Sequence, residues 1–393
     1  MKLNVAIMFG GKSVEHEVSI ISAMQAINAL DKTKVNVIPI YISKDSQLYS
    51  GDSLLNIETY SDLEQAKSQS NSVYLYKDKN NVYMNLIKPK LFKEQKQLID
   101  IVIPIMHGTY GEDGKLQGFL ELLDVPFASS DTTASAIGQD KVIMKHIFQN
   151  SGLPIVNWFW LYGFEFKNDQ TPFLEKAETL GYPVVIKPAN LGSSIGISFA
   201  KNADEFIEAI HLASEFDEKI VVEKAISNLR EVNCSVLGDV YHNEVSLIEE
   251  VGSSAELLSF DEKYLSNAKG SKMQGMASTK RDVPAQLSSA LEAEVHRLSK
   301  AVVHSLNSSG ICRIDFMIDA ITDAIYINEI NTMPGSLAFY LWADKGVDFS
   351  QIMGNLIQQA IDRKRRSDQR TTTYASNILS NYAANGSKGK LKM

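Results

Sequence analysis

The stretch YINEINTMPGS, residues 326–336, places a carboxylate and an amide two positions apart at the end of an apolar run. On a β-strand, residues i and i+2 point to the same face, so Glu329 and Asn331 would lie side by side. Asp315, in the run ICRIDFMID, adds a carboxylate about a hairpin away. Three hard oxygen donors in this arrangement suit Mg²⁺ bridging nucleotide phosphates. Arg313 shares the face of Asp315 and would stabilise negative charge on a reacting oxygen.

A second group of residues could hold phosphate. The loop KPANLGSSIGI begins at Lys187 and supplies two glycines together with Ser193 and Ser194. Glycines let backbone N–H groups converge on an anion, the hydroxyls add donors, and the lysine adds a charge. The loop is not a Walker A motif, because the Gly-Lys-Ser/Thr order is absent. Lys141, at a predicted helix start, and Lys224, at the end of the apolar run VVEK, are further phosphate candidates.

Two polar clusters lie in the first third of the chain. In GGKSVEHEVS, Glu15 follows a Gly-Gly turn near a helix start, where an incoming ammonium group could pair with it. The alternative is an ordinary first-turn helix acid. In HGTYGEDG, His107 closes an apolar strand, at the end where open α/β sheets bind ligands. Because three glycines and the pair Glu112 and Asp113 follow it, we expect a functional histidine instead of a structural one.

These residues need a scaffold of several domains, since 393 residues with 44% hydrophobic content exceed one ordinary core. The runs NVAIMF, VNVIPIYI and LIDIVIPIM are typical of buried parallel strands, and a hairpin-like piece lies in the polar insert after them. The second unit alternates helix and strand, with a more antiparallel sheet. The predicted segments are an open parallel α/β domain over 1–125, a central unit over 126–225, a third unit over 226–365 with a polar loop at 253–279, and a mobile basic tail over 366–393.

The net charge and the lengths of the apolar runs exclude several classes of protein. A formal net charge of −8 argues against a general nucleic-acid or anionic-membrane binder, and the basic run RKRR is interpreted as solvated surface. No apolar run reaches the roughly 18 residues of a membrane span, and the N-terminal run does not end in a signal cleavage site. We therefore expect a cytoplasmic protein that binds neither nucleic acid nor membrane. Cys234 and Cys312 lie in apolar runs and are expected to be buried, inert thiols.

Taken in order, six motifs resemble those of the D-alanine-D-alanine ligases of the ATP-grasp superfamily. They are GGKSVEHEVS, HGTYGEDGKLQG, DK at 140–141, KPANLGSSIGI, REVNCSVLG with RIDF, and NEINTMPG. The resemblance spans residues 3–360 and implies an N-terminal α/β domain followed by two α+β domains that clamp ATP. It also implies that two D-alanines are joined through D-alanyl phosphate for peptidoglycan synthesis, with ATP and two Mg²⁺ or Mn²⁺ ions, in a homodimer.

The resemblance assigns roles residue by residue. Nucleotide would be bound by Lys141, Lys187, Ser194, Glu223, Lys224, Ile226, Glu231 and Lys263, with Glu223 on the adenine amino group and Glu231 on the ribose. Metal would be bound by Asp315, Glu329 and Asn331. The catalytic set would be Glu15, Ser193, Tyr264 and Arg313, with Glu15 holding the first ammonium group. Substrate would contact Glu15, His107, Gly335, Tyr340 and Leu341, and the loop over 253–279 would close as a lid.

The sequence departs from the family pattern after Pro-Gly. Leu337 stands where a threonine is usual, and Tyr340 stands where a serine binds the second substrate's carboxylate. In the lid, Leu258 replaces a usual tyrosine. These changes leave the first half-reaction intact and keep D-serine or D-lactate open as the second substrate. The alternative from another class is a nucleotide-binding regulatory protein without catalysis, against which the matching phosphate, metal and oxyanion positions speak.

Overall fold

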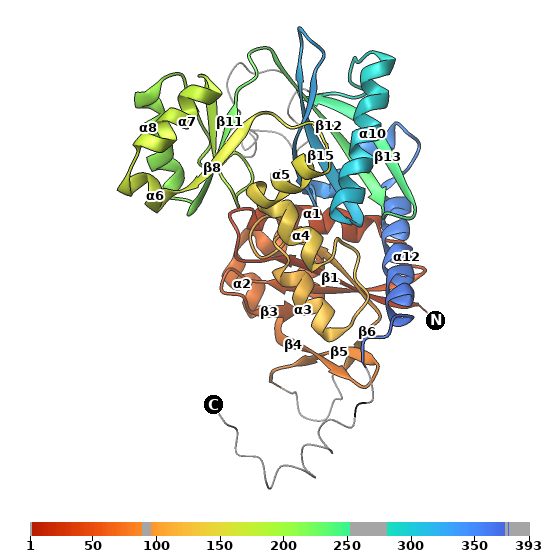
Figure 1. Cartoon of the computed structure of the whole chain (residues 1–393). Coiled ribbons are helices and arrows are strands. Elements are labelled where there is room, and N and C mark those ends of the chain that lie inside the picture. The colour runs from red at the N-terminus through yellow and green to blue at the C-terminus, as the bar shows by residue number, and fades with distance from the viewer. Residues whose placement is uncertain (1, 89–95, 252–280, 374–375, 377–393) are drawn as a thin grey trace.

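The computed structural model describes residues 2–88, 96–251, 281–373 and 376. The elements form a seven-stranded, a four-stranded and a five-stranded sheet, each with its own helices (Figure 1). The predicted lid over 253–279 lies outside the described residues, and Leu258, Lys263 and Tyr264 lie there with it. Within the described ranges, no helix is long and apolar enough to cross a membrane.

The N-terminal sheet has the strand order β6-β5-β4-β3-β2-β1-β7. Its strands are β1 (Leu3–Gly10), β2 (Val35–Ile42), β3 (Leu48–Ser50), β4 (Asn71–Asp78), β5 (Asn81–Leu86), β6 (Gln97–Ile99) and β7 (Ile101–Ile105). Only β2, β1 and β7 are parallel, as the three apolar runs predicted. The polar insert adds antiparallel strands instead. The tight turn between β4 and β5 can join only antiparallel neighbours.

Helices and short turns connect these strands and continue from them. They are α1 (His16–Ala29), η1 (Asp52–Leu55), η2 (Ile57–Ser61), α2 (Leu63–Ser68), α3 (Lys115–Leu123) and α4 (Thr132–Gln139). The apolar positions Ile20, Ala23, Met24 and Ile27 of α1 are buried against the sheet, as their helical spacing predicts. Gly11, at φ 93°, allows the turn that brings Glu15 to the N-terminus of α1.

The central sheet is antiparallel throughout, as predicted, in the order β10-β9-β11-β8. Its strands are β8 (Trp158–Tyr162), β9 (Val184–Pro188), β10 (Ser198–Ala200) and β11 (Lys219–Lys224). The helices α6 (Gly163–Asn168), α7 (Thr171–Leu180) and α8 (Ala203–Ser214) accompany it. Phe166, Phe206 and Ile220 belong to its buried core.

The C-terminal sheet is also antiparallel, in the order β14-β13-β12-β15-β16. Its strands are β12 (Leu229–Gly238), β13 (Asn243–Val251), β14 (Arg281–Asp282), β15 (Gly310–Asp319) and β16 (Ile325–Asn331). The helices α5 (Lys141–Asn150) and α10 (Ser289–Leu306) pack on one face, where Met144 and Phe148 join Leu298 and Ile314 in one core. The sequence predicts helix α5 in the central unit, and Val142 does pack with Val221 of the central sheet, but Met144 and Phe148 pack on the third sheet.

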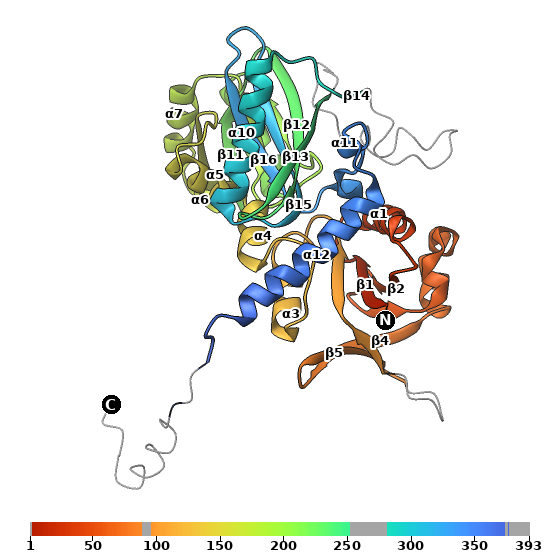
Figure 2. The ribbon, with the colours of Figure 1, turned by 90° about the vertical axis from the view of Figure 1, so that its right-hand side faces the viewer.

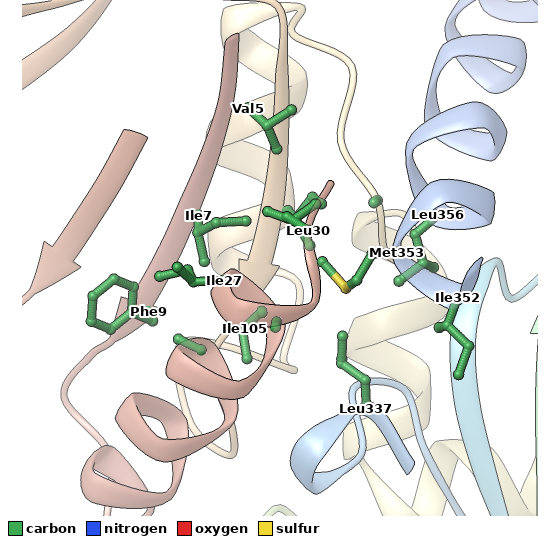
Figure 3. Close-up of a cluster of buried hydrophobic side chains, with 14 of the residues drawn as sticks. Val5, Ile7, Phe9, Ile27, Leu30, Ile105, Leu337, Ile352, Met353 and Leu356 are labelled. Carbon is green, nitrogen blue, oxygen red and sulfur yellow. The ribbon is translucent and has the colours of Figure 1, made fainter. Parts of the chain in front are cut away.

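The last helix within the described residues, α12 (Phe349–Asp368), follows η4 (Gly335–Ala338) and α11 (Tyr340–Ala343) and lies between the N-terminal and C-terminal sheets (Figures 1 and 2). Ile352, Met353 and Leu356 pack with Val5, Ile7 and Ile105 of the first sheet in one core (Figure 3). Helix α12 therefore completes the hydrophobic core to which β1 contributes Val5 and Ile7.

The predicted basic tail begins inside this helix, which corrects the expectation that the chain is mobile from residue 366. Arg366 pairs with Asp239, and its guanidinium lies 4.6 Å from the centre of the Tyr241 ring. Arg363 donates to the Phe127 carbonyl at 2.7 Å and to Ser309 Oγ at 2.8 Å. The run RKRR thus binds the protein itself, because helical spacing turns these side chains toward neighbouring carbonyls and a carboxylate.

Both cysteines are buried and free. Burial raises the pKa of Cys234 to about 11 and that of Cys312 to about 12, so neither forms a thiolate near neutral pH. The prediction of inert thiols is confirmed.

Candidate active site

The face of β15 and β16 gathers the acidic and amide side chains that the sequence singled out. Asp315 lies opposite Glu329, and Arg313 lies opposite Asn331, in the antiparallel register. Arg313 donates to both Asp315 oxygens, at 2.6 and 2.7 Å, and Asn331 Nδ2 donates to Asp315 Oδ2 at 3.0 Å. Burial alone would lower the pKa of Arg313, but the Asp315 carboxylate raises it well above its ordinary value. The shared face of these residues is confirmed.

A β-bulge in β16 adds a residue to this face. The register passes from Asp315 opposite Glu329 to Phe316 opposite Ile327, which leaves Asn328 as the extra residue. The bulge lets Ile327 and Ile330 both enter the core although they are three positions apart. Asn328 Oδ1 accepts a hydrogen bond from Lys187 Nζ at 2.9 Å. Asn328 is not among the residues predicted from the sequence, although two adjacent polar residues in an alternating strand are a usable signal.

Two lysines from other elements face these residues. Lys141, the first residue of α5, lies 3.1 Å from Glu329 Oε2 and donates to the Leu191 carbonyl at 2.7 Å. Lys187, on β9, lies 2.6 Å from Glu223 Oε2 in addition to its bond with Asn328. The two lysines therefore connect α5 and the central sheet to the acidic face of the C-terminal sheet.

Glu223 on β11 is enclosed by cations. Lys145 Nζ lies 2.5 Å from Glu223 Oε1, and Lys187 Nζ lies 2.6 Å from Glu223 Oε2. Burial alone would raise the pKa of Glu223, but the two lysines hold it at about 2. Burial lowers the pKa of Lys145, whose side chain is fully buried. Lys145 is not among the residues predicted from the sequence, although it follows Lys141 by four positions and so lies on the same helix face.

The other predicted nucleotide residues lie around the link from β11 to β12. Lys224 ends β11, and its Nζ donates to the carbonyls of Gly181 at 2.8 Å and Tyr182 at 3.2 Å. Ile226 is half-buried in the link itself, and Glu231 is half-buried on β12. The side chain of Lys224 thus braces the chain that leads into β9.

The glycine-rich loop after β9 reaches the N-terminal domain. Ser193 and Ser194 have positive φ values of 56° and 60°, a conformation that orients successive backbone N–H groups toward one side. The hydroxyl of Ser193 donates to Glu15 Oε1. Glu15 is buried and is the N-cap residue of α1. The structure therefore brings together Glu15 and Ser193, which are far apart in the sequence.

His107 differs from its expected role. Its Nδ1–H donates to the Met333 carbonyl at 2.9 Å, because a carbonyl can only accept, and Nε2 then accepts from the Ser22 hydroxyl at 2.9 Å. Ser22 Oγ also accepts from the Ser336 N–H at 2.9 Å. Burial lowers the pKa of His107, consistent with this neutral ring. Both ring nitrogens are engaged within the protein, so His107 supports the turn at 333–336 instead of offering a nitrogen to substrate.

Glu112 supports the same turn and was not assigned from the sequence. Its two oxygens accept from the backbone N–H of Gly108, at 2.8 Å, and of Met333, at 3.0 Å. Burial and then the charge of Glu15 raise the pKa of Glu112 to about 8. Buried Glu112 and His107 thus hold the segment that precedes Gly335.

The segment after Pro334 is a left-handed turn. Ser336, Leu337 and Ala338 have φ values of 53°, 50° and 48°, which non-glycine residues rarely adopt. Backbone strain of this kind persists where surrounding structure fixes it, commonly at functional sites. Leu341 is fully buried in the core, so any contact it makes with substrate is through its backbone.

The oxygen donors fit a magnesium ion that is completed by phosphate. Asp315, Glu329 and Asn331 offer two carboxylates and one amide on adjacent strands, and Mg²⁺ commonly takes one or two carboxylates and shares phosphate oxygens. Among the described residues, no group of three or more His, Cys, Asp or Glu side chains could hold a metal ion by itself. The donor set therefore suits a metal ion that arrives with a nucleotide.

The site as a whole can neutralise two anions that approach each other. Each of three cations faces one carboxylate. Lys141 faces Glu329, Lys187 faces Glu223, and Arg313 faces Asp315. Phosphate and metal could replace these internal partners, since Arg313, Asp315 and Glu329 share one face of the C-terminal sheet and the two lysines reach it from α5 and β9. Such an arrangement suits phosphoryl transfer, in which positioning and charge stabilisation supply most of the catalysis.

Comparison with known families matches this description over both parts of the chain. The family described as "D-ala D-ala ligase N-terminus" matches residues 4–130, and "D-ala D-ala ligase C-terminus" matches residues 147–358. A D-alanine-D-alanine ligase of Thermosipho melanesiensis is 38% identical over 380 residues, covering 96% of this chain and 98% of that protein. One of Chloroherpeton thalassium is 38% identical, covering 92% of this chain and 97% of that protein.

Solved structures resemble the chain over nearly its whole length. The VanG D-Ala:D-Ser ligase of Enterococcus faecalis has a TM-score of 0.75 and 27% identity. The match covers 92% of this chain and 100% of that chain. A D-alanine-D-alanine ligase of Bacillus anthracis complexed with ATP has a TM-score of 0.65 and 25% identity, covering 93% and 99%. The corresponding Coxiella burnetii structure, at 24% identity and a TM-score of 0.77 over 98% and 99%, shows the fold alone.

Proposed function

The chain belongs to the D-alanine-D-alanine ligase family, and from this premise we propose that it joins two D-alanines into D-alanyl-D-alanine for peptidoglycan synthesis. ATP is converted to ADP and phosphate in the reaction. The observation that carries the proposal is the common face of Arg313, Asp315, Glu329 and Asn331, met by Lys141 from α5. A regulatory protein without catalysis would not need metal ligands, a lysine that binds phosphate and an arginine that stabilises an oxyanion in one place.

In the first step, a carboxylate oxygen of D-alanine attacks the γ-phosphorus of ATP, and ADP leaves. Two anions must approach each other, so Lys141, Lys187 and the backbone N–H groups around Ser193 and Ser194 would neutralise and orient them. Glu15, fixed by the Ser193 hydroxyl, would bind the ammonium group of this first D-alanine. The product of the step is D-alanyl phosphate.

In the second step, the amine of the other D-alanine attacks the acyl carbon, and phosphate leaves. Negative charge develops on the carbonyl oxygen, where Arg313 and the N–H of Gly335 would donate. Support comes from Glu112 and His107, which fix the backbone immediately before Gly335. The roles of Lys263 and Tyr264, outside the described residues, stay predictions from the family resemblance.

We assign the metal role to Asp315, Glu329 and Asn331. Mg²⁺, or Mn²⁺ in its place, would supply charge neutralisation between the phosphates when bound. For the nucleotide base and ribose, Glu223, Lys224, Ile226 and Glu231 are the proposed contacts. Glu223 already forms ion pairs with two lysines, and an adenine amino group would donate to a remaining lone pair of the same carboxylate.

An acceptor other than D-alanine is the second candidate, favoured by Leu337 and Tyr340 after the Pro-Gly turn. A D-Ala:D-Ser ligase is among the structural relatives, but the sequence relatives over most of the chain are D-alanine-D-alanine ligases. D-alanine as acceptor is therefore the conclusion that fits better.

The test is an ADP-release assay with ATP, Mg²⁺ and D-alanine, with D-serine or D-lactate in competing reactions and the products identified by mass spectrometry. We expect D-alanyl-D-alanine as the main product and loss of turnover in Arg313→Ala. Absence of both ADP release and dipeptide would refute the function. Preference for D-serine or D-lactate over D-alanine as acceptor would establish the second candidate.

We also propose that the protein is a homodimer and acts in the cytoplasm, where ATP and D-alanine are available. Light scattering at several concentrations tests the first proposal, with a mass near twice 43.6 kDa as the expected result. A concentration-independent monomer would contradict it.

A further inference from the structure

Tyr340, the first residue of α11, directs its hydroxyl to a buried acid. The hydroxyl donates to Glu249 Oε1 at 3.0 Å, and Glu249, on β13, is only 1% exposed. Asn233 Nδ2 donates to the same oxygen at 2.9 Å. A phenol has one proton, so while Tyr340 binds Glu249 it cannot donate to the carboxylate of a substrate.

Arg281 places a cation beside this pair. It is the first residue of β14, its Nη1 lies 3.4 Å from Glu249 Oε2, and its guanidinium carbon lies 4.9 Å from the centre of the Tyr340 ring. Its side chain is 14% exposed. An ion pair on one edge and an aromatic face below fix the plane of a guanidinium, which has five N–H donors and can bind a second carboxylate as well.

Glu249 lies in the same cross-strand row as the proposed metal ligands. Glu249 on β13 is opposite Asn233 on β12, Asn233 is opposite Asp315 on β15, and Asp315 is opposite Glu329 on β16. Lys141 contacts the Glu329 end of the row, whereas Arg281 contacts the Glu249 end. Arg313 lies between them, and both Tyr340 and Glu249 act electrostatically on it.

The second D-alanine needs a cation at the Glu249 end. Its amine must reach the acyl carbon near Arg313, and its carboxylate is one carbon away from that amine. Lys141 and Lys187 lie at the phosphate end, and Arg313 already donates to both oxygens of Asp315. A carboxylate placed near buried Glu249 without a cation would be repelled, so the guanidinium at this end has a clear chemical use.

We propose that Arg281 binds the carboxylate of the second D-alanine, with Glu249 and Tyr340 as positioning residues that hold its guanidinium. This assignment rests on the proposed function and names the acceptor contact within it. It gives the Tyr340 substitution a consequence, because the tyrosine serves as the platform for a cation instead of as the carboxylate's own donor.

The test uses the full-length protein and initial rates over a wide range of D-alanine concentrations, which separate the KM of the donor from that of the acceptor. In Arg281→Gln, the acceptor KM should rise about 30-fold, since a charge-assisted hydrogen-bond pair is lost, while the donor KM stays within about twofold. Arg281→Lys should recover part of the loss. Tyr340→Phe should raise the acceptor KM by a smaller factor, because only the positioning contact is removed.

A neutral acceptor provides a readout that a structural defect would not move. The wild-type protein should prefer D-alanine to D-alaninamide as acceptor, and Arg281→Gln should lose most of that preference. Arg297→Gln, on an exposed arginine of α10, is the matched control and should retain both KM values. If the wild type forms no dipeptide, the proposed function itself fails. If it forms dipeptide but Arg281→Gln keeps the acceptor KM and the preference, or raises both KM values equally, only the assignment of Arg281 is overturned.

Discussion

At the scale of single residues, the site is built from charges that the protein neutralises internally. Glu223 binds two lysines, Asp315 binds Arg313, and Glu329 binds Lys141. A buried acid deprived of its cations would be costly, because the interior solvates charge poorly. These internal pairs thus hold in place the cations that we propose to bind phosphate.

Lys145→Met should destabilise the protein by about 3 kcal/mol, because it removes one partner of a fully buried ion pair. The pH dependence should change as well. The pKa of Glu223 is about 2 in the folded protein and 4.5 ordinarily, so its stabilising contribution is present above pH 4.5 and is lost as pH falls toward 2. In Lys145→Met the folded pKa of Glu223 should lie closer to 4.5, so this acid-induced loss of stability should be smaller.

Denaturant unfolding at pH 3, 4 and 7 would measure both effects. Lys201→Met, at an exposed lysine, is the control and should unfold like the wild type. Equal stability of Lys145→Met and Lys201→Met would refute the buried pair.

Glu112 should give the opposite pH dependence. Its pKa is about 8 in the folded protein against an ordinary 4.5, so its contribution is fully present below pH 4.5 and is lost as pH rises through 8. Glu112→Gln cannot ionise. The free energy of unfolding of the wild type minus that of Glu112→Gln should therefore fall between pH 5 and 8, as measured by urea denaturation.

Because His107 is present in both proteins, its own titration cancels in this difference. A difference that is constant from pH 5 to 8 would show that Glu112 ionises at its ordinary pKa.

At the scale of elements, the bulge at Asn328 sets which side chains of β16 reach the site. Without an extra residue, strict alternation from Glu329 would turn Ile327 and Ile325 toward the site, yet both lie in the core. The bulge reverses the alternation once and leaves Asn328 in contact with Lys187. Because of this one extra residue, the same short strand can turn its isoleucines to the core and its acidic and amide residues to the site.

Deleting Asn328 should preserve the fold, because the flanking residues then alternate without a bulge and keep both faces. It should weaken ATP binding about tenfold, since Lys187 loses a hydrogen-bonding partner. Deleting Ile330 instead would turn Asn331 and the following Pro-Gly turn to the wrong face.

Thermal unfolding and ATP titration distinguish the two deletions. We expect a Tm near that of the wild type for the Asn328 deletion and a large decrease for the Ile330 deletion. Comparable loss of fold in both would contradict this account of the strand.

At the scale of the whole molecule, α12 joins the last part of the chain to the first. Its side chains Ile352, Met353 and Leu356 share a core with Val5 and Ile7 of the N-terminal sheet (Figure 3). The same helix also contacts β12 and β15, the strands that carry Asn233 and Arg313. The positions of Glu15 and of Arg313 are therefore coupled through a common hydrophobic core as well as through the site.

Leu356→Ala should destabilise the protein by about 3 kcal/mol, because a fully buried leucine leaves a cavity in that shared core. We expect the N-terminal and C-terminal sheets to unfold together at a lower Tm, which calorimetry would record as one transition. Gln358→Ala, at an exposed position of the same helix, should leave the Tm nearly unchanged. Two separate transitions in Leu356→Ala would show that the cores are independent.

The sequence by itself determined the family, the apolar strands of the three units and the pairs within a strand or hairpin. The two-residue period of a strand predicts that Glu329 and Asn331 share a face, and that Arg313 and Asp315 do so as well. The helical pattern predicts that Lys141 lies at a helix start. Local backbone geometry fixes such relations, so they can be read without long-range contacts.

Only the tertiary structure decided which distant side chains meet. The contacts of His107 with Met333 and of Tyr340 with Glu249 join segments that no local pattern relates. The physical reason is that a hydrogen bond or ion pair forms wherever packing of the sheets and helices places its partners, and burial then selects the partners that satisfy each charge. For that reason the sequence identified Tyr340 as an unusual residue, and the fold shows that its hydroxyl is bound to Glu249 beneath Arg281.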